Sequence, residues 1–301
     1  MPLTVFPQPP ELVVNWHITE ACNYACRFCY AKWEDKGRAK ELVHDLGAVK
    51  ALISEVGHFF ASDNDGNMLR QHMRWRSLRL NVAGGEPLLY SAKVLEMMAL
   101  ARAMEMQASI ITNGSRLTPA LMKEMAPQLS LLGLSLDAVN EPVNLAIGRA
   151  DRHARTLSLA ALSDVLQSGR RINPAMRTKI NSVVNALNWE EDMSDVIRDL
   201  APDKWKVLRM LPRVTDDLAV TDAQFQSFVE RHQGVHAGMR VEDNSDMTES
   251  YIMIDPLGRF YQNHPEGQGY RYSDPILEVG AAHAFSQVHL SAAKFCSRYA
   301  V

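Results

Sequence analysis

The chain has 301 residues, a formal net charge of −3 and 47% hydrophobic residues, so it can bury a large core. Its length fits one barrel-sized domain or two smaller ones, and its four cysteines do not suggest a disulfide framework. No apolar run approaches the roughly 18 residues that cross a bilayer, and the N-terminus lacks a leader pattern. These features predict a cytoplasmic protein with no membrane contact and no general nucleic-acid-binding surface.

The first predicted strand, residues 12–18, leads directly into a loop with three cysteines, and helical spacing of apolar residues follows over 38–60. Strand and helix signals then alternate along the chain. They are strand 77–84, helix 92–106, strand 108–112, strand 129–137, helix 154–167, strand 177–185, a helix with Asn188 as its N-cap, and strand 204–211. This alternation predicts parallel βαβ units, and hence an α/β barrel or a doubly wound sheet.

Beyond Pro212 the pattern changes. A helix at 222–232, two short strands between 250 and 263, and a last helix at 280–299 follow without the parallel rhythm. We therefore interpret residues 1–211 as a barrel and residues 212–301 as a C-terminal extension that closes over the site.

The loop after the first strand carries Cys22, Cys26 and Cys29, with Phe28 and Tyr30 beside the last of them. Three thiolates leave one coordination position open, which indicates chemistry at a metal rather than a closed structural site. The alternative is a zinc knuckle or a redox CxxC pair, but the nearest downstream histidine, at position 44, is fifteen residues past the last cysteine. The CxxxCxxC spacing resembles the cluster loop of the radical S-adenosylmethionine (SAM) enzymes.

That resemblance implies a [4Fe-4S] cluster, SAM bound to its unique iron, and the partial (β/α)6 TIM-type barrel of the family. The turn Gly84-Gly85-Glu86-Pro87 after the second strand resembles the family's GGEP motif, which binds the SAM amino group. Glycines allow close backbone approach, a carboxylate suits an ammonium group and proline stiffens the turn. In isolation the motif is an ordinary strand-to-helix turn. The resemblance assigns four further residues to SAM, namely Asn113, Ser115, Ser135 and Arg149.

Polar residues stand two apart in four of the predicted strands, so each pair shares one strand face. The pairs are Asn15 and His17, Arg79 and Asn81, Lys179 and Asn181, and Lys204 and Lys206. Four cations facing the helix layer would each cost several kcal/mol, so we expect them to line the barrel lumen. Asp137 is the main acidic residue of these strands, so an anion is needed, and a polyphosphate suits converging cations. For Lys204 the alternative is a solvent-exposed strand end.

No GxxxxGK[ST] loop is present, so a nucleotide would be bound without a P-loop. Four longer blocks resemble the viperin family within the radical SAM enzymes, namely LSLDAVNEPVNLAIGR, KINSVVNALNWEEDM, KWKV and SYIMID. The chain departs from animal viperins at Arg79, Ala83 and Lys204, where those proteins have lysine, serine and arginine, and it lacks their preceding amphipathic helix. These changes put the base preference in doubt.

The resemblance implies radical dehydration of a ribonucleoside triphosphate (CTP, UTP or GTP) to its 3′-deoxy-3′,4′-didehydro form, a chain terminator in antiviral defence. An external electron donor of the flavodoxin or ferredoxin type is implied as a partner. The substrate-binding residues expected are Asn15, Arg79, Asn81, Lys179, Asn181, Lys204, Lys206 and Tyr251. The proton donor to the departing hydroxyl is not identified, and His17 is only a weak candidate. Another small-molecule radical SAM enzyme or activase, or a non-catalytic metal-binding protein, are the alternatives, and Cys296 is interpreted as a buried or tail thiol.

Overall fold

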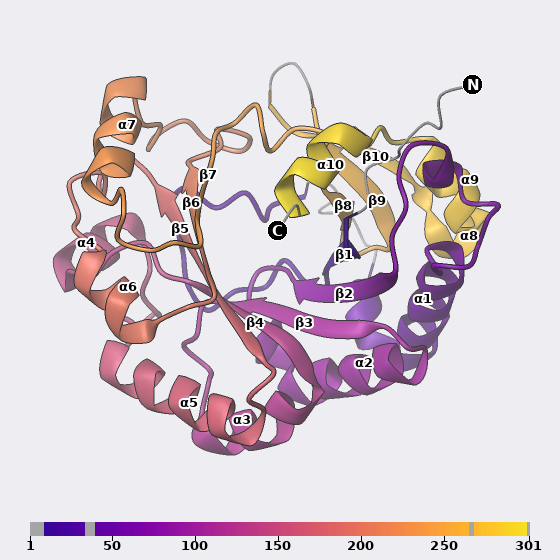
Figure 1. The fold of residues 1–301 in the computed structure, drawn as a ribbon, viewed down its shortest axis with the longest axis horizontal. Coiled ribbons are helices and arrows are strands. Elements are labelled where there is room, and N and C mark those ends of the chain that lie inside the picture. The colour runs from indigo at the N-terminus through magenta and orange to yellow at the C-terminus, as the bar shows by residue number, and fades with distance from the viewer. Residues whose placement is uncertain (1–8, 34–39, 265–267, 300–301) are drawn as a thin grey trace.

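The computed structural model describes residues 9–33, 40–264 and 268–299. The described strands form one curved ten-stranded sheet in the order β10-β9-β8-β1-β2-β3-β4-β5-β6-β7, with helices on its outer side (Figure 1). The strands are β1 (Glu11–His17), β2 (Ser77–Ala83), β3 (Gln107–Thr112), β4 (Leu129–Ser135), β5 (Arg177–Val184), β6 (Lys204–Arg209), β7 (Met239–Glu242), β8 (Ile252–Ile254), β9 (Arg259–Asn263) and β10 (Tyr270–Pro275). The helices are α1 (Leu46–Phe59), α2 (Ser91–Ala103), α3 (Pro119–Met125), α4 (Glu141–Ile147), α5 (Leu159–Ile172), α6 (Ser194–Leu200), α7 (Asp222–Arg231), α8 (Ile276–Val279), α9 (Ala281–Ser286) and α10 (Ala292–Tyr299).

The six predicted parallel strands, β1 to β6, are confirmed, and they form the partial barrel. Two further strands are also parallel, since β7 pairs with β6 and β8 pairs with β1. The expectation that the parallel rhythm ends near residue 212 is therefore wrong, although β9 and β10 are antiparallel. The two short strands predicted between 250 and 263 correspond to β8 and β9, but the parallel pairing of β8 with β1 and the four-residue strand β7 were not predicted. The division into two parts at residue 212 stays a prediction.

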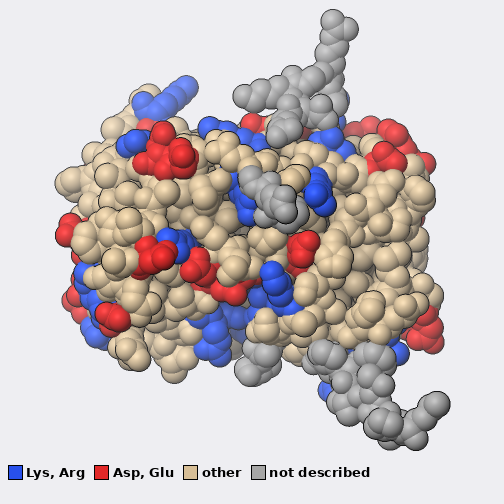
Figure 2. Space-filling model, turned by 90° about the horizontal axis from the view of Figure 1, so that it is seen from above, with Lys and Arg blue, Asp and Glu red and all other residues tan. Residues whose placement is uncertain are grey.

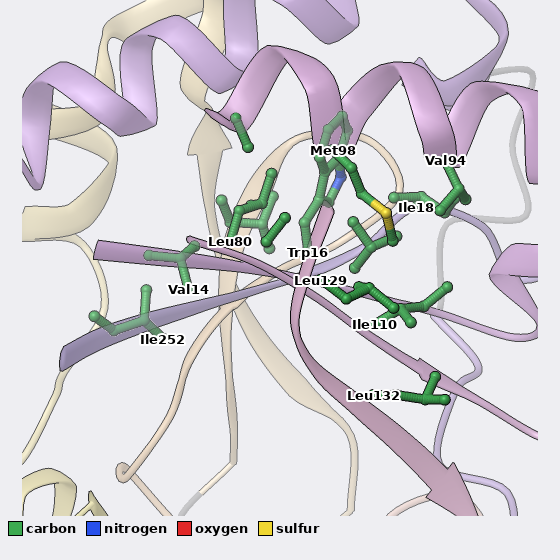
Figure 3. Close-up of a cluster of buried hydrophobic side chains, with 14 of the residues drawn as sticks. Val14, Trp16, Ile18, Leu80, Val94, Met98, Ile110, Leu129, Leu132 and Ile252 are labelled. Carbon is green, nitrogen blue, oxygen red and sulfur yellow. The ribbon is translucent and has the colours of Figure 1, made fainter. Parts of the chain in front are cut away.

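The hydrophobic core lies between the sheet and the outer helices. Val14, Trp16 and Ile18 alternate along β1 and its end, and all three are buried toward α2, where Val94 and Met98 contact the same cluster (Figure 3). Because successive side chains of a strand point to opposite faces, the residues between them face the lumen. Burial of the apolar face of β1 against the helices therefore determines which of its side chains face the barrel lumen.

Helix α5 begins and ends later than the predicted helix at 154–167. The Ser158 side chain accepts a hydrogen bond from Ala161 N and caps the helix start. Gly169 does not end the helix but lies inside it, where a Cβ would come within 2.9 Å of side-chain atoms of Met122 and Met176. Gly169 therefore allows α5 to pack closely against these two methionines and does not mark the end of the helix.

Two other boundary predictions are wrong. Asn188 does not cap a helix, because α6 begins at Ser194 and the Asn188 amide instead donates to Asp137 O (2.7 Å) and Val183 O (2.9 Å). The predicted last helix at 280–299 is divided between α9 and α10, and Gly280, with a φ of 80°, separates α9 from α8, which precedes the predicted range.

The surface carries charges of both signs. On the face drawn in Figure 2, Lys and Arg side chains are interspersed with Asp and Glu side chains, as expected for a net charge of −3. Within the ranges that the structure describes, no helix combines the length and the apolar character needed to cross a membrane.

Candidate functional site

A cavity of about 400 Å³ occupies the barrel lumen. Every polar residue that the strand pattern predicted to face the lumen lines it, namely Asn15, His17, Arg79, Asn81, Lys179, Asn181, Lys204 and Lys206, and Tyr251 joins them. The alternation in β5 shows why, because Thr178 and Ile180 are buried against the helix layer while Lys179 and Asn181 face inward. The prediction of a cation-rich lumen is confirmed.

Two of the four cations already have carboxylate partners. Arg79 forms an ion pair with Glu11 at 3.1 Å, and Lys206 forms one with Glu242. Asp137, the main acidic residue of the predicted strands, does not balance these cations, because it pairs with Arg149 at 3.2 Å near the cysteine loop. The acids that do serve the lumen lie at strand ends outside the predicted pairs.

Lys179 and Lys204 have no carboxylate partner among the described residues. Burial, followed by the neighbouring cations Lys206 and Arg79, lowers the pKa of Lys179 well below its usual value. Burial and Lys206 lower the pKa of Lys204 to about 8, and its ammonium group donates only to Arg298 O at 3.4 Å. Half-buried Lys204 is thus not a fully solvated strand end. The lumen therefore holds an excess of positive charge that an anion would relieve.

The lumen amides are held in fixed orientations. Asn81 Nδ2 donates to Asn15 Oδ1 at 2.9 Å, and Asn15 Nδ2 donates to Ile252 O at 3.1 Å. Ser109 Oγ donates to Asn81 Oδ1 at 2.7 Å. By contrast, Asn181 Oδ1 is buried and has no hydrogen-bond partner among the described residues, so it remains an acceptor for a ligand.

His17 lies in an aromatic cage formed by Tyr30, Trp33 and Tyr261, with ring centroids 5.4 to 5.9 Å away. Burial lowers the pKa of His17 to about 3. The imidazole is therefore neutral near pH 7, and it cannot supply a proton as an imidazolium ion. This removes the sequence-based argument for His17 as the proton donor to a departing hydroxyl.

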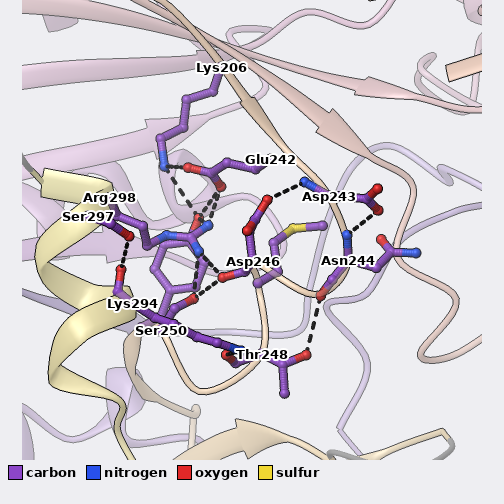
Figure 4. Close-up of polar contacts among 12 residues, drawn as sticks. Lys206, Glu242, Asp243, Asn244, Asp246, Thr248, Ser250, Lys294, Ser297 and Arg298 are labelled. Carbon is purple, nitrogen blue, oxygen red and sulfur yellow. Dashed lines mark hydrogen bonds and ion pairs between the residues drawn. The ribbon is translucent and has the colours of Figure 1, made fainter. Parts of the chain in front are cut away.

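A buried ionic network joins the lumen to the C-terminal helix (Figure 4). The Glu242 carboxylate accepts hydrogen bonds from Lys206, Arg298 and the Tyr251 hydroxyl, the last at 2.9 Å. Burial raises the pKa of Glu242, but Lys206 and Arg298 outweigh it and hold the pKa below its usual value. Arg298 also donates to Ser250 Oγ. Helix α10 thereby connects β7 to the segment that leads into β8, across what we call the open seam, the gap where the described parts of β7 and β8 are not hydrogen-bonded to each other.

The three loop cysteines lie at the C-terminal end of β1, where barrel sites are found. Cys22 is exposed, Cys26 and Cys29 are half-buried, and all three are free thiols. Burial raises the pKa of each thiol, to about 11 for Cys29, so metal binding would have to displace protons. Within the described ranges no three Cys, His, Asp or Glu side chains converge on a point that could hold one metal ion.

A four-iron cluster places different demands on these cysteines, because each thiolate binds a different iron and the sulfurs need not meet at one point. The loop is anchored by backbone bonds, with Ala25 N donating to Gly148 O (3.2 Å) and Arg27 N donating to Ile147 O (3.0 Å). A Cβ on Gly148 would lie 2.2 Å from Ala25 O, so glycine is needed there. Three thiols on an anchored loop fit a cluster with one iron left for another ligand.

The GGEP turn is bonded to the cysteine loop through its backbone. Gly85 N donates to Thr19 O at 2.7 Å, and Glu86 N donates to Ala21 O at 2.8 Å. A Cβ at position 85 would lie 2.3 Å from Ala21 O, so only glycine allows this approach. The two glycines of the motif, Gly84 and Gly85, therefore position the turn against the cluster loop.

The Glu86 carboxylate is fully buried and accepts hydrogen bonds from Leu88 N, Thr112 Oγ1 and Asn113 N, at 2.7 to 2.9 Å. Burial raises its pKa above the usual value despite these bonds. In this structure the carboxylate holds the turn and the end of β3 together. Its contact with the SAM amino group, and that of the neighbouring Pro87, stay predictions.

Asn113 and Ser115 brace the cysteine loop from the end of β3. Asn113 Nδ2 donates to Asn23 Oδ1 (3.0 Å) and lies 3.8 Å from Cys22 Sγ, and Asn23 Nδ2 donates to Ser115 Oγ (2.9 Å). Both residues therefore lie beside the first cysteine, where a molecule bound to the cluster would approach.

Arg149 lies beside the second cysteine. Its guanidinium group pairs with Asp137, donates to Ser135 O and lies 3.7 Å from Cys26 Sγ. Tyr24, Ser135 and Arg149 line a second cavity of about 240 Å³. The residues that resemblance assigns to SAM thus surround the cysteine loop on two sides, as binding of SAM to the cluster requires.

The sequence argument missed three residues that line the lumen, Glu11, Arg177 and Arg240, and two residues of the adjoining ionic network, Glu242 and Arg298. Arg177 carried a usable signal, because it continues the period-two pattern of Lys179 and Asn181 in β5. The roles of Glu242 and Arg298 depend on contact between β7 and α10, and no local pattern reports such a contact.

Comparison with known proteins agrees with this geometry. A family model described as the radical SAM superfamily matches residues 16–169. The chain is 42% identical over 290 residues to a protein of Pseudoalteromonas ulvae named S-adenosylmethionine-dependent nucleotide dehydratase, with 96% of this chain and 93% of that protein covered. A protein of the same name from Psychrobacter lutiphocae is 40% identical, with 96% and 95% covered. The zebrafish (Danio rerio) S-adenosylmethionine-dependent nucleotide dehydratase RSAD2 is 32% identical, with 90% and 72% covered.

The solved structure of native anSMEcpe with bound AdoMet has the same fold, with a TM-score of 0.64 and 13% identity over 92% of this chain and 81% of that one. The fold, the cysteine loop and the sequence relatives all indicate the same family. The chain belongs to the radical SAM superfamily and, within it, to the viperin family of S-adenosylmethionine-dependent nucleotide dehydratases.

Proposed function

We propose that this enzyme dehydrates a ribonucleoside triphosphate, CTP, UTP or GTP, to the 3′-deoxy-3′,4′-didehydro nucleotide. The observation that carries the proposal is the convergence of Arg79, Lys179, Lys204 and Lys206 in one cavity below the cysteine loop. Four cations with two carboxylates among their partners suit the negative charge of a triphosphate. The names of the relatives, nucleotide dehydratases, support the same substrate class.

The family's [4Fe-4S] cluster and SAM, when bound, supply the radical that removes a hydrogen atom from the ribose C4′. Cys22, Cys26 and Cys29 would hold the cluster, and the backbone of Gly84 and Gly85 would approach SAM. For each nucleotide dehydrated, two electrons and one proton enter, the 3′-hydroxyl leaves as water, and SAM becomes methionine and 5′-deoxyadenosine. The electrons come from an external donor, for which we propose a flavodoxin or ferredoxin.

The chain's own residues position the nucleotide. The ribose has to lie near the cysteine loop, where the bonded amides of Asn15 and Asn81 and the unpartnered Asn181 Oδ1 offer fixed hydrogen-bond partners. Apolar side chains at the same end, including the buried Phe28, keep water from the reacting carbon. His17 is neutral near pH 7 in this structure, and we do not assign it as the source of the proton for the departing hydroxyl.

We further propose that the enzyme acts in the cytoplasm, without membrane or nucleic-acid contact, and that its product terminates viral polymerases. The four free cysteines support a reducing compartment, and the mixed charges of the surface support the absence of nucleic-acid binding. Its close sequence relation to the viperin family supports the antiviral role.

The test is an anaerobic assay of the iron-reconstituted enzyme with SAM, dithionite and each of CTP, UTP, GTP and ATP in turn. Mass spectrometry follows 5′-deoxyadenosine and a triphosphate lighter by one water. We expect at least one dehydrated triphosphate from the parent enzyme and none from Lys179→Met, which retains the cysteine loop. If 5′-deoxyadenosine forms in the parent while every triphosphate stays intact, the triphosphate is not the substrate and another small-molecule radical reaction takes its place.

A further inference from the structure

The lumen cavity extends along the whole barrel to the N-terminal ends of the strands. Arg177 and Lys204 are the first residues of β5 and β6, and both line it. Pro10, Arg177, Asp203 and Arg240 line the same end and are exposed. The cavity therefore reaches the surface at the end of the barrel opposite the cysteine loop.

Cations continue along the lumen toward this N-terminal mouth. Arg177 stands two residues before Lys179 on the same face of β5, about 6.6 Å further along the strand. In β6 and β7, Lys206 is paired in register with Arg240, and Lys179 is paired with Lys204. Arg177 thus lies beyond Lys179 on β5, whereas Lys204 and Arg240 are level in register with Lys179 and Lys206, and Arg177, Lys204 and Arg240 all line the cavity.

The carboxylates at the mouth are already engaged. Asp203 accepts hydrogen bonds from Thr178 N (2.6 Å) and Thr178 Oγ1 (3.1 Å), and Glu11 is paired with Arg79. Among the residues that the structure describes, neither Arg177 nor Arg240 has a carboxylate partner, and the one hydrogen bond given for Arg240 is to Met239 O. These two guanidinium groups are therefore available to an anion in the mouth.

The direction of the nucleotide follows from the proposed function. The ribose has to meet the radical at the cysteine loop, so the phosphate chain points away from it, past Lys179 and Lys206. The terminal phosphate then lies nearest the mouth. A longer chain would extend it toward Arg177 and Arg240 rather than into a closed wall.

We propose that Arg177 and Arg240, beside Lys204 of the triphosphate site, form an outer phosphate site, so that the enzyme binds and dehydrates nucleoside tetraphosphates as well as triphosphates. This inference rests on the proposed function for the orientation of the nucleotide. The fourth phosphate takes no part in the dehydration, which removes the same water from the same ribose carbons.

Calorimetric titration of the metal-free protein with inorganic tripolyphosphate and tetrapolyphosphate tests the site without the loaded enzyme. We expect the tetrapolyphosphate to bind about fivefold more tightly than the tripolyphosphate, a modest gain because both arginines are exposed. Arg177→Gln and Arg240→Gln should each reduce that gain and leave tripolyphosphate binding within about twofold. Arg171→Gln, an exposed residue of α5 that does not line the cavity, is the matched control.

Three results would overturn the outer site or its premise, and they are distinguishable. If tripolyphosphate itself fails to bind, the proposed nucleotide site is wrong. If it binds but the fourth phosphate adds nothing, the outer site is wrong and the proposed function stands. If both variants weaken the two anions equally, the arginines only attract anions at long range. Conversion of the nucleoside tetraphosphate to its dehydrated form by the reconstituted enzyme, seen by mass spectrometry, would complete the support.

Discussion

The two ends of the barrel differ in how far the chain completes its own contacts. At the cysteine loop, polar side chains such as Glu86 and Asn113 bind one another or the backbone, and Arg149 is paired with Asp137. In the lower lumen, Lys179 and Lys204 have no carboxylate partner among the described residues. At the cysteine loop the polar side chains are already paired and can hold a cofactor in place. In the lumen, positive charge remains that a bound substrate can balance. Substitutions at the two ends of the barrel should therefore impair different properties of the enzyme.

The largest effect is expected at the loop. Cys26→Ala removes one of the three proposed cluster ligands and should lower SAM cleavage by more than about 100-fold, because the cofactor carries the chemistry. Iron and sulfide per chain and 5′-deoxyadenosine formation measure the loss. Cys296→Ala, which removes a thiol of α10, is the control and should retain iron. Full iron and activity in Cys26→Ala would show that the loop does not hold the cluster.

The network at the open seam should show the next largest effect. Glu242→Gln removes the carboxylate that Lys206 and Arg298 share, and Arg298→Met removes one of the two cations of Glu242, and breaking such a buried pair costs about 3–5 kcal/mol of the free energy of unfolding. The double variant should lose less than the sum of the two, and urea titration measures all three. Asp195→Asn, in an exposed pair with Arg198, should cost less than about 0.5 kcal/mol. Strictly additive losses would mean that the two groups do not act together.

Substitution of Lys179 should have opposite effects on thermal stability and on nucleotide binding. Lys179→Met removes a cation from a positive environment, so the melting temperature should rise. The same change should weaken nucleotide binding by about 10- to 100-fold, because a charged hydrogen bond is lost. Thermal melting and calorimetry test the two effects, with the exposed Lys123→Met as control. A lower melting temperature with unchanged nucleotide binding would show that Lys179 stabilises the fold and does not bind the substrate.

The smallest effect concerns pH. The pKa of Lys204 is about 8 in the free protein, and a bound anion favours its charged form. Above pH 8 binding must therefore also take up a proton, so tripolyphosphate affinity should fall by up to about tenfold between pH 7 and pH 9. Lys204→Arg, which stays charged, should flatten the curve. An affinity that rises over this range, or an equally steep curve for the variant, would exclude Lys204 as the titrating group.

Much of the barrel could be predicted from the sequence, because its strands and the cysteine loop depend on local patterns. The apolar runs of β1 to β6 and the period-two polar pairs place Lys179 and Asn181 correctly in the lumen. The spacing of Cys22, Cys26 and Cys29 marks the loop at the expected end of β1.

What the sequence could not show are contacts between distant segments. Strand β7 is too short for periodicity, and the pairing of β8 with β1 joins segments far apart in the chain. The partners of Lys206 and Arg79 also come from the ends of other strands. The bonds of Glu86 to Thr112 and Asn113 are another contact between distant segments that its place in the GGEP turn does not reveal, and its contact with SAM stays a prediction. Charge balance in a cavity is a tertiary property, and only assembled strands reveal it.

The position of β1 in the sheet has a consequence for folding. Its two neighbours are far away in sequence, with Asn15 bonded to Asn81, 66 residues later, and to Ile252, 237 residues later. Such a high sequence separation slows folding, and the edge of β1 that receives β8 stays unpaired until the C-terminal quarter of the chain arrives. An unpaired strand edge is a template for another chain. Refolding yield should therefore fall as protein concentration rises, with aggregates joined through the exposed edge of β1.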